Sequence, residues 1–393
     1  MVQKSKNVSL VFRMHQPVGL ARFNHFRRQG RGFDQYFEVP APGESYYLRQ
    51  HAARTYYPFN ELLRSLLTGY EDFGFTLSVS GVMLEQLERT DPELLSSISQ
   101  LAADRRVELT AQTYHNSYSW FYSHREYAQQ LREHRAALRT YLRAKPRLLS
   151  VSSIMLTPEL ASFVSALGYK GVIVESSTGS SFAVKPDHLA PDLSDLAVEY
   201  RFAKRLPDTL AVLPARSLDA RLDRLTAEQL ADEIAASADD HAVLQLDYES
   251  LSETHTENWI NLMEQLPQAF EKRNISFRSP SRLIRQSLQQ NTISRPKQKF
   301  LENRLQQEAI EQLYSIEKLI ASLEQTYRDR VTSRQIAGTW RKLQTADHFA
   351  WMATSGFMAG DSGNSPYDSP YDAYINYMNV LQDFTAEVEK LAK

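Results

Sequence analysis

Reactive side chains follow several short apolar runs in the first 250 residues of the chain. Each run is rich in β-branched residues, which is typical of a buried strand. If these strands are parallel, their carboxyl ends meet at one rim, and the polar residues that follow them share one site. The residues that come next after the runs include Arg13, His15, Gln16, Gln112, His115, Glu159, Glu175, Asp247, Tyr248 and Glu249.

Carboxylates delivered by separate strands suit the hydrolysis of a glycosidic bond. One carboxylate attacks the anomeric carbon or activates water, and the other protonates the leaving oxygen. Glu159 and Asp247 are the candidates for this pair. A separation of about 5–5.5 Å would indicate a covalent intermediate and a wider one inversion, and the spacing in the sequence leaves that choice open.

Each of these residues also has an ordinary structural explanation. Glu159 follows Pro158, as an acid in the first turn of a helix often does, and Asp247 could cap the next segment. A metal site is a further alternative, because His15, His115, Asp247 and Glu249 could hold a divalent ion for hydrolysis or deacetylation. Neither a His-x-x-x-His nor a His-Glu-x-x-His spacing occurs, so we favour a site without metal or cofactor.

Strand and helix patterns alternate over the first 280 residues. Helical periodicity occurs at 125–144, 227–238 and 258–273. This alternation predicts parallel βαβ units, and about seven units indicate an α/β fold of the (β/α)7 type, an incomplete TIM barrel. A doubly wound open sheet is the alternative. Strands are expected at 8–12, 75–79, 107–111, 148–153, 171–174, 210–214, 242–246 and, more weakly, 275–277.

The pattern changes after residue 285. A polar stretch that contains a proline reads as a linker or loop, and residues 300–330 then carry apolar side chains at helical spacing. We therefore expect a barrel catalytic domain over 1–285 and a C-terminal helical region over 286–393 that packs on the barrel. A separate coiled-coil helix is the alternative, although the apolar stripe is short for one.

Composition excludes several other classes of protein. Lys and Arg number 45 against 47 Asp and Glu, so a basic surface for nucleic acid is not expected. The absence of cysteine excludes disulfides, thiolate metal sites and cysteine nucleophiles. The N-terminal residues lack the apolar core of a signal peptide and no apolar window is long enough for a membrane span, which predicts a cytoplasmic protein. The oligomeric state is not predicted.

Several segments resemble, in chain order, the signatures of glycoside hydrolase family 57. The first segment carries His15-Gln16-Pro17, the core of the first signature. Segments 75–88 and 369–384 are similar to the α-amylase branch of that family, so the resemblance extends over nearly the whole chain. The five segments that match the signatures are 12–20, 107–117, 152–175, 246–255 and 340–352.

This resemblance implies retention at α-glucosidic linkages, without a metal, in a (β/α)7 barrel followed by helices. Glu159 matches the nucleophile of the family and Asp247 its general acid/base. The implied substrate is an α-1,4-glucan or maltooligosaccharide, in a reaction of the α-amylase or 4-α-glucanotransferase type. Trp340 and Trp351 would be stacking platforms for the sugar. The substrate-binding residues implied in this way are His15, Gln16, His115, Tyr248, Trp340, Asp347 and Trp351.

Some residues around the two carboxylates differ from the α-amylase branch. Leu156 stands where that branch has an arginine that would help to keep the nucleophile ionised. Gln112 stands where it has a glutamate, and Ser252 and Thr254 replace a glycine and a histidine. These exchanges lead to an alternative function, that of a catalytically weakened, α-amylase-like glucan-binding protein.

Overall fold

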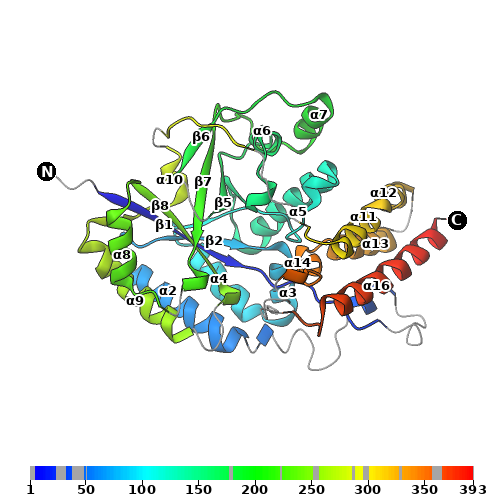
Figure 1. Ribbon diagram of the computed structural model, residues 1–393, viewed down its shortest axis with the longest axis horizontal. Helices are drawn as coiled ribbons and strands as arrows, with labels where there is room; N and C mark the ends of the chain where they lie inside the picture. The colour runs from blue at the N-terminus through cyan, green and yellow to red at the C-terminus, as the bar shows by residue number, and fades with distance from the viewer. Residues whose placement is uncertain are drawn as a thin grey trace. The chain divides into compact units, whose positions relative to one another are not determined.

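Parallel strands surrounded by helices form one part of the chain, and a set of helices forms another, in the computed structural model of the protein (Figure 1). No helix in the described part of the chain is long and apolar enough to cross a membrane. The structure describes residues 5–23, 32–37, 48–49, 51–176, 180–221, 224–250, 256–285, 288–294, 301–326, 330–355 and 365–392.

Within the described residues the sheet holds nine strands, and seven of them are parallel neighbours in the order β3-β2-β1-β8-β7-β5-β4. Strand β6 pairs antiparallel with β7, and β9 pairs with the N-terminal end of β1. The strands are β1 (Lys6–Met14), β2 (Phe75–Val79), β3 (Val107–Leu109), β4 (Leu148–Val151), β5 (Gly171–Glu175), β6 (Phe182–Val184), β7 (Leu210–Ser217), β8 (His241–Asp247) and β9 (Ile275–Phe277).

A parallel bridge between Ala111 and Leu149 joins the two outer strands of this order. The Ala111 N–H donates to the Leu148 carbonyl at 2.9 Å, and the Ser150 N–H donates to the Ala111 carbonyl at 2.7 Å. Strand β3 therefore meets β4, and the seven strands form a nearly closed ring. The predicted (β/α)7 barrel is confirmed, and the open sheet is excluded.

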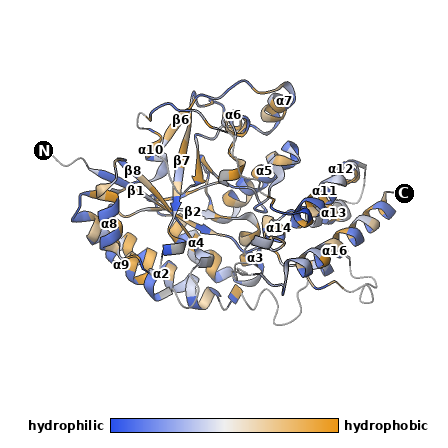
Figure 2. Ribbon diagram, in the orientation of Figure 1, coloured by the Kyte–Doolittle hydropathy of each residue, from blue (hydrophilic) through white to orange (hydrophobic). Residues whose placement is uncertain are grey.

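Alternating residues of the barrel strands face opposite sides, as strand geometry requires. Val8, Leu10, Phe12 and Met14 of β1 belong to the large buried cluster that includes the surrounding helices. Val11 belongs to a second cluster, with Ile173, Leu213 and Val243, that fills the barrel interior. Figure 2 colours β7 and β8 largely as hydrophobic, whereas the helices around them carry both colours.

The expected strands all occur, with small changes at their ends, and β6 is an addition that the sequence did not indicate. Three residues are too few to give a period-2 pattern, and β6 exists because its backbone pairs with β7. The three helices expected between strands occur as α5 (His124–Leu142), α8 (Ala227–Ala236) and α9 (Thr256–Glu271). The helices of the barrel part are α2 (Tyr57–Gly69), α3 (Gly81–Thr90), α4 (Pro92–Ala102), α5 (His124–Leu142), α6 (Pro158–Leu167), α7 (Pro191–Tyr200), α8 (Ala227–Ala236), α9 (Thr256–Glu271) and α10 (Pro280–Leu283).

Helices at the C-terminal end form their own core. The stripe expected over 300–330 forms two helices, which are separated at Ile316. Helix α16 packs on α11 and α12, around a buried cluster that includes Trp340, Tyr377 and Phe384. These helices are α11 (Arg304–Ser315), α12 (Glu317–Thr326), α13 (Arg330–Lys342), α14 (Ala346–Ala350) and α16 (Pro370–Leu391).

The chain divides into two compact units that do not follow a single cut in the sequence. The barrel unit comprises residues 1–16, 48–114 and 125–297, and the helical unit comprises residues 17–47, 115–124 and 298–393. The segments that follow β1 and β3 thus belong to the helical unit. The expected domain boundary at residue 285 stays a proposal, because compact units are not the same as independently folding domains.

Candidate active site

Asp247 is the last residue of β8 and lies beside Arg13 of β1. The two residues are direct partners in the parallel register, so their side chains lie on the same face of the sheet. Arg13 Nη2 lies 2.8 Å from Asp247 Oδ2, with the aspartate side chain only 19% exposed. A charged pair therefore lies at the carboxyl end of the barrel, where barrel enzymes keep their chemistry.

Asp219 holds the backbone of Asp247 in place. The Asp247 N–H donates to Asp219 Oδ1 at 3.0 Å, and the hydroxyl of Ser217 donates to Asp219 Oδ2 at 2.6 Å. Asp247 Oδ1 is buried and has no hydrogen-bond partner among the described residues. Buried carboxylate oxygens normally accept a hydrogen bond. Because Asp247 Oδ1 accepts none from these residues, it is available to exchange a proton with a bound substrate.

Burial raises the pKa of the Asp247 carboxyl group to about 6, because the charged form loses hydration. Arg13 and, more weakly, His15 lower this pKa, whereas Asp219 and Glu175 raise it. The result is a carboxylic acid that gains or loses its proton near neutral pH. This property is what a general acid/base requires.

Glu175 at the end of β5 is a second acid beside the same arginine. Its Oε2 lies 4.0 Å from Arg13 Nη1, and its side chain is 53% exposed. The Arg13 guanidinium thus lies between the carboxylates of Glu175 and Asp247. The sequence predicted that Glu175 lies at the rim but gave it no role. Its position as the final residue of a strand was the feature that could have indicated a functional residue.

Glu159 lies in the first turn of helix α6, which follows β4, and its side chain is exposed. Thr157 caps this helix by accepting the Leu160 N–H at 3.2 Å, and Pro158 takes the first helical position. Strands β5 and β7 lie between β4 and β8 in the sheet. Glu159 follows β4 and Asp247 ends β8, so the two acids come from strands that are not neighbours. The helix N-terminus stabilises the negative charge on Glu159.

His15 is buried directly after β1. Its Nδ1 lies 2.8 Å from the hydroxyl of Ser80, which also accepts the Met83 N–H at the start of α3. The Gln16 carbonyl accepts from Gln86 Nε2 at 3.0 Å. These bonds fix the first predicted motif to the end of β2 and to α3.

Gln112 and a histidine that the sequence did not single out fix the end of β3. The Gln112 N–H donates to His134 Nδ1 at 3.2 Å, so the proton of this imidazole is on Nε2, 2.7 Å from the Val79 carbonyl. Burial lowers the pKa of His134 to about 4, which keeps it neutral. A histidine within a helical run carries no sequence signal for this role.

His115 and Asp347 belong to the helical unit, where their segments are joined. His115 is 4% exposed, the Ala346 N–H donates to the Asn116 carbonyl at 3.0 Å, and Ser117 forms an antiparallel bridge with Thr345. Asp347, half-buried in the first turn of α14, follows at once. The second and fifth sequence motifs thus come together within this unit.

Two of the predicted substrate-binding aromatics lie in cores. Tyr248 is 1% exposed and donates its hydroxyl to Asn60 Oδ1 at 2.9 Å. Trp340 is 2% exposed and donates Nε1–H to the Leu313 carbonyl at 2.9 Å. Neither ring presents a face for a sugar, so their predicted contact with substrate is corrected. Trp351 is half-buried beside Tyr367, with ring centroids 5.9 Å apart, and its contact with substrate stays a prediction.

A metal site was the alternative for His15, His115, Asp247 and Glu249. In the described part of the chain, no group of three or more His, Asp or Glu residues is arranged to hold an ion. The side chain of Glu249 and residues 251–255, with the exchanged Ser252 and Thr254, lie outside the described residues.

A parallel barrel that carries acids in unlike environments at its carboxyl rim is an arrangement found in barrel hydrolases. A family model described as "Glycosyl hydrolase family 57" matches residues 9–296. The chain therefore belongs to glycosyl hydrolase family 57, a family of glycoside hydrolases.

The chain is similar to individual relatives in sequence or in fold. It is 23% identical, over 98% of its length and 85% of the relative, to a Methanocaldococcus jannaschii protein described as "Putative alpha-amylase". The GH57-type branching enzyme of Pyrococcus horikoshii has a TM-score of 0.64 and 12% identity, over 99% of this chain and 94% of that one.

The 4-alpha-glucanotransferase of Thermococcus litoralis also shares the fold. Its TM-score is 0.53 at 14% identity, over 95% of this chain. The match spans 55% of the Thermococcus litoralis chain, so the present chain corresponds to little more than half of that enzyme.

Proposed function

We propose that this protein is a retaining glycoside hydrolase acting on α-1,4-glucan or maltooligosaccharides, with Glu159 as nucleophile and Asp247 as general acid/base. The observation that carries the proposal is the environment of Asp247. Burial raises its pKa to about 6 while Arg13 lies 2.8 Å away. An acid with this pKa can be protonated for one step and ionised for the next.

The environment of Glu159 supports the complementary role. A nucleophile must be ionised when the substrate binds, and the N-terminus of helix α6 stabilises that charge. Two carboxyl groups in unlike surroundings, one buried and one at a helix N-terminus, divide the roles of acid and nucleophile between them. Leu156 stands where the α-amylase branch has an arginine. The helix N-terminus supplies positive potential near Glu159 without that arginine.

In the first step, a Glu159 oxygen attacks the anomeric carbon and the glycosidic C–O bond breaks. Protonated Asp247 gives its proton to the leaving oxygen and becomes a carboxylate, which the Arg13 guanidinium stabilises. In the second step, Asp247 takes a proton from water, the oxygen of that water bonds to the anomeric carbon, and the bond to Glu159 breaks. If a sugar hydroxyl replaces the water, the result is transfer.

Relatives support the choice of substrate. Those relatives are described as a putative α-amylase, a 4-α-glucanotransferase and a branching enzyme, and the first two names refer to α-glucan chemistry. Trp351 and Tyr367, together with Asp347, offer aromatic and polar groups for sugar contact in the helical unit.

The test is Glu159→Gln with maltoheptaose as substrate. We expect turnover to fall by roughly a thousandfold or more, as for loss of a nucleophile, while thermal unfolding is unchanged because the side chain is exposed. Wild-type activity in the variant would refute the nucleophile assignment. Saturable maltoheptaose binding by the wild-type protein without any product would favour the alternative, a glucan-binding protein without catalysis.

A further inference from the structure

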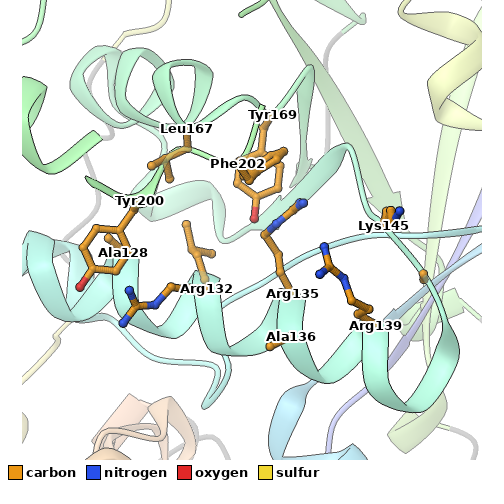
Figure 3. A pocket seen from close by; sticks show the side chains of 12 residues that line it. Ala128, Arg132, Arg135, Ala136, Arg139, Lys145, Leu167, Tyr169, Tyr200 and Phe202 are labelled. Carbon is orange, nitrogen blue, oxygen red and sulfur yellow. The ribbon is translucent and has the colours of Figure 1, made fainter. Parts of the chain in front are cut away.

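A pocket of about 230 Å³ opens on the barrel unit beside helix α5. Arg132, Arg135 and Arg139 lie at spacings of three and four residues and so project from one side of α5 (Figure 3). Lys145 lies at the end of the pocket next to Arg139. The remaining lining consists of Ala128, Leu131, Ala136, Ala144, Leu167, Tyr169, Tyr200 and Phe202.

The charge of this pocket is one-sided. Four of its twelve lining residues are cations and none is an acid, whereas the chain as a whole has a net charge of −2. In the described part of the chain, no carboxylate forms an ion pair with Arg132, Arg135, Arg139 or Lys145. The pocket therefore attracts an anion that the protein itself does not supply.

Two of the arginines are held in place by aromatic rings. The guanidinium carbon of Arg135 lies 3.3 Å from the Phe202 ring centroid, and Arg135 also donates to the Pro146 carbonyl at 2.8 Å. The guanidinium carbon of Arg132 lies 4.7 Å from the ring centroid of Tyr200. Arg132 also donates from Nη2 to Gln129 Oε1. Stacking leaves the edge of a guanidinium accessible, and the N–H donors of that edge that are not used within the protein can bind an oxyanion.

A buried hydroxyl points into the same pocket. Tyr169 is 0% exposed. Arg135 beside it can only donate to its Oη, and the hydroxyl proton has no acceptor among the residues that the structure describes. Figure 3 shows this hydroxyl directed toward Arg135. A buried hydroxyl whose proton has no acceptor is costly, and a ligand oxygen beside Arg135 would accept that proton.

We propose that this pocket binds a small organic phosphate, with the phosphate group on Arg135 and Arg139 and a compact body against the apolar wall. A phosphate monoester has about two negative charges and three acceptor oxygens, which match these guanidinium groups and one hydroxyl. The volume suits a group the size of a hexose rather than a polymer. The site is separate from Asp247 and Glu159 and does not depend on the proposed reaction.

Titration calorimetry with glucose 1-phosphate, inorganic phosphate and glucose tests this assignment. We expect saturable binding of glucose 1-phosphate, weaker binding of inorganic phosphate and none of glucose, with affinity falling as salt increases. Equal binding of glucose and its phosphate would refute an anion site. Absence of any saturable binding at millimolar concentration would overturn the proposal altogether.

Arg139→Gln locates the binding. Arg139 is exposed on α5, so its loss should not affect folding, and we expect affinity for glucose 1-phosphate to fall about tenfold, the effect of one charge-assisted hydrogen bond. Arg334→Gln, which removes an equally exposed arginine from α13, is the matched control and should leave affinity unchanged. If both variants bind like the wild type, the phosphate binds elsewhere and the pocket assignment is wrong.

Discussion

The Arg13 guanidinium lies 2.8 Å from the Asp247 carboxylate and 4.0 Å from that of Glu175. One cation thus contacts the proposed acid/base and a second acid at the carboxyl end of the barrel. The contact follows from the parallel register, in which Arg13 and Asp247 are direct partners. The electrostatics of this group determine how the activity should depend on pH.

Activity should decline on the alkaline side of about pH 6. Asp247 must be protonated to act as an acid, and its pKa is about 6, so the competent fraction falls as pH rises through that value. We expect this limb in the pH profile of kcat/KM for maltoheptaose. An alkaline limb that persists unchanged in Asp247→Asn would show that another group is responsible.

Arg13→Met should move the alkaline limb of the kcat/KM profile to higher pH. Arg13 lowers the pKa of Asp247, so its removal lets burial raise the pKa further and keeps the acid protonated over a wider range. Arg13→Lys retains the positive charge and is the matched control, with a limb close to that of the wild type. A shift to lower pH in Arg13→Met would contradict the electrostatic assignment.

Asp219→Asn should move the alkaline limb of the pH profile to lower pH. The Asp219 carboxylate raises the pKa of Asp247, and the substitution removes its charge while an amide oxygen can still accept the Asp247 N–H, as Asp219 Oδ1 does at 3.0 Å. The alkaline limb of kcat/KM should therefore lie at lower pH than in the wild type. Opposite shifts in the Arg13 and Asp219 variants would be hard to explain by general loss of structure.

Glu175→Gln distinguishes the two glutamates of the rim. If Glu159 is the nucleophile, Glu175→Gln retains turnover and alters mainly the alkaline limb, which moves to lower pH because Glu175 raises the pKa of Asp247. A loss of turnover as complete as that expected for Glu159→Gln would instead make Glu175 the nucleophile. Mass spectrometry of a trapped glycosyl-enzyme would identify the labelled residue directly.

Gly81→Ala should destabilise the barrel unit. A Cβ at Gly81 would lie 2.3 Å from Cδ2 of Tyr114, so the ring must move and the free energy of unfolding should fall by roughly 1–3 kcal/mol. Gly69→Ala, at a helix end with nothing within 4 Å of the added Cβ, is the control. Denaturant unfolding should give a lower free energy of unfolding for Gly81→Ala than for Gly69→Ala. Equal free energies would show that the Tyr114 ring can move aside at little cost.

The sequence by itself determined the order of strands and helices and the positions of Glu159 and Asp247 along the chain. β-branched runs at regular intervals are local signals, and the acids that follow them can be read without knowing which strands are neighbours. The family signatures added the roles of those acids, which remain proposals here.

Only the tertiary structure decided which of these residues share an environment. It joined β3 to β4 through Ala111, and it buried Trp340 and Tyr248, whose sequence context does not distinguish a core ring from a sugar platform. It also paired Arg13 with Asp247, which are separated by more than 230 residues in the chain. Such contacts depend on strand register and burial, and these are properties of the assembled barrel that no local pattern encodes.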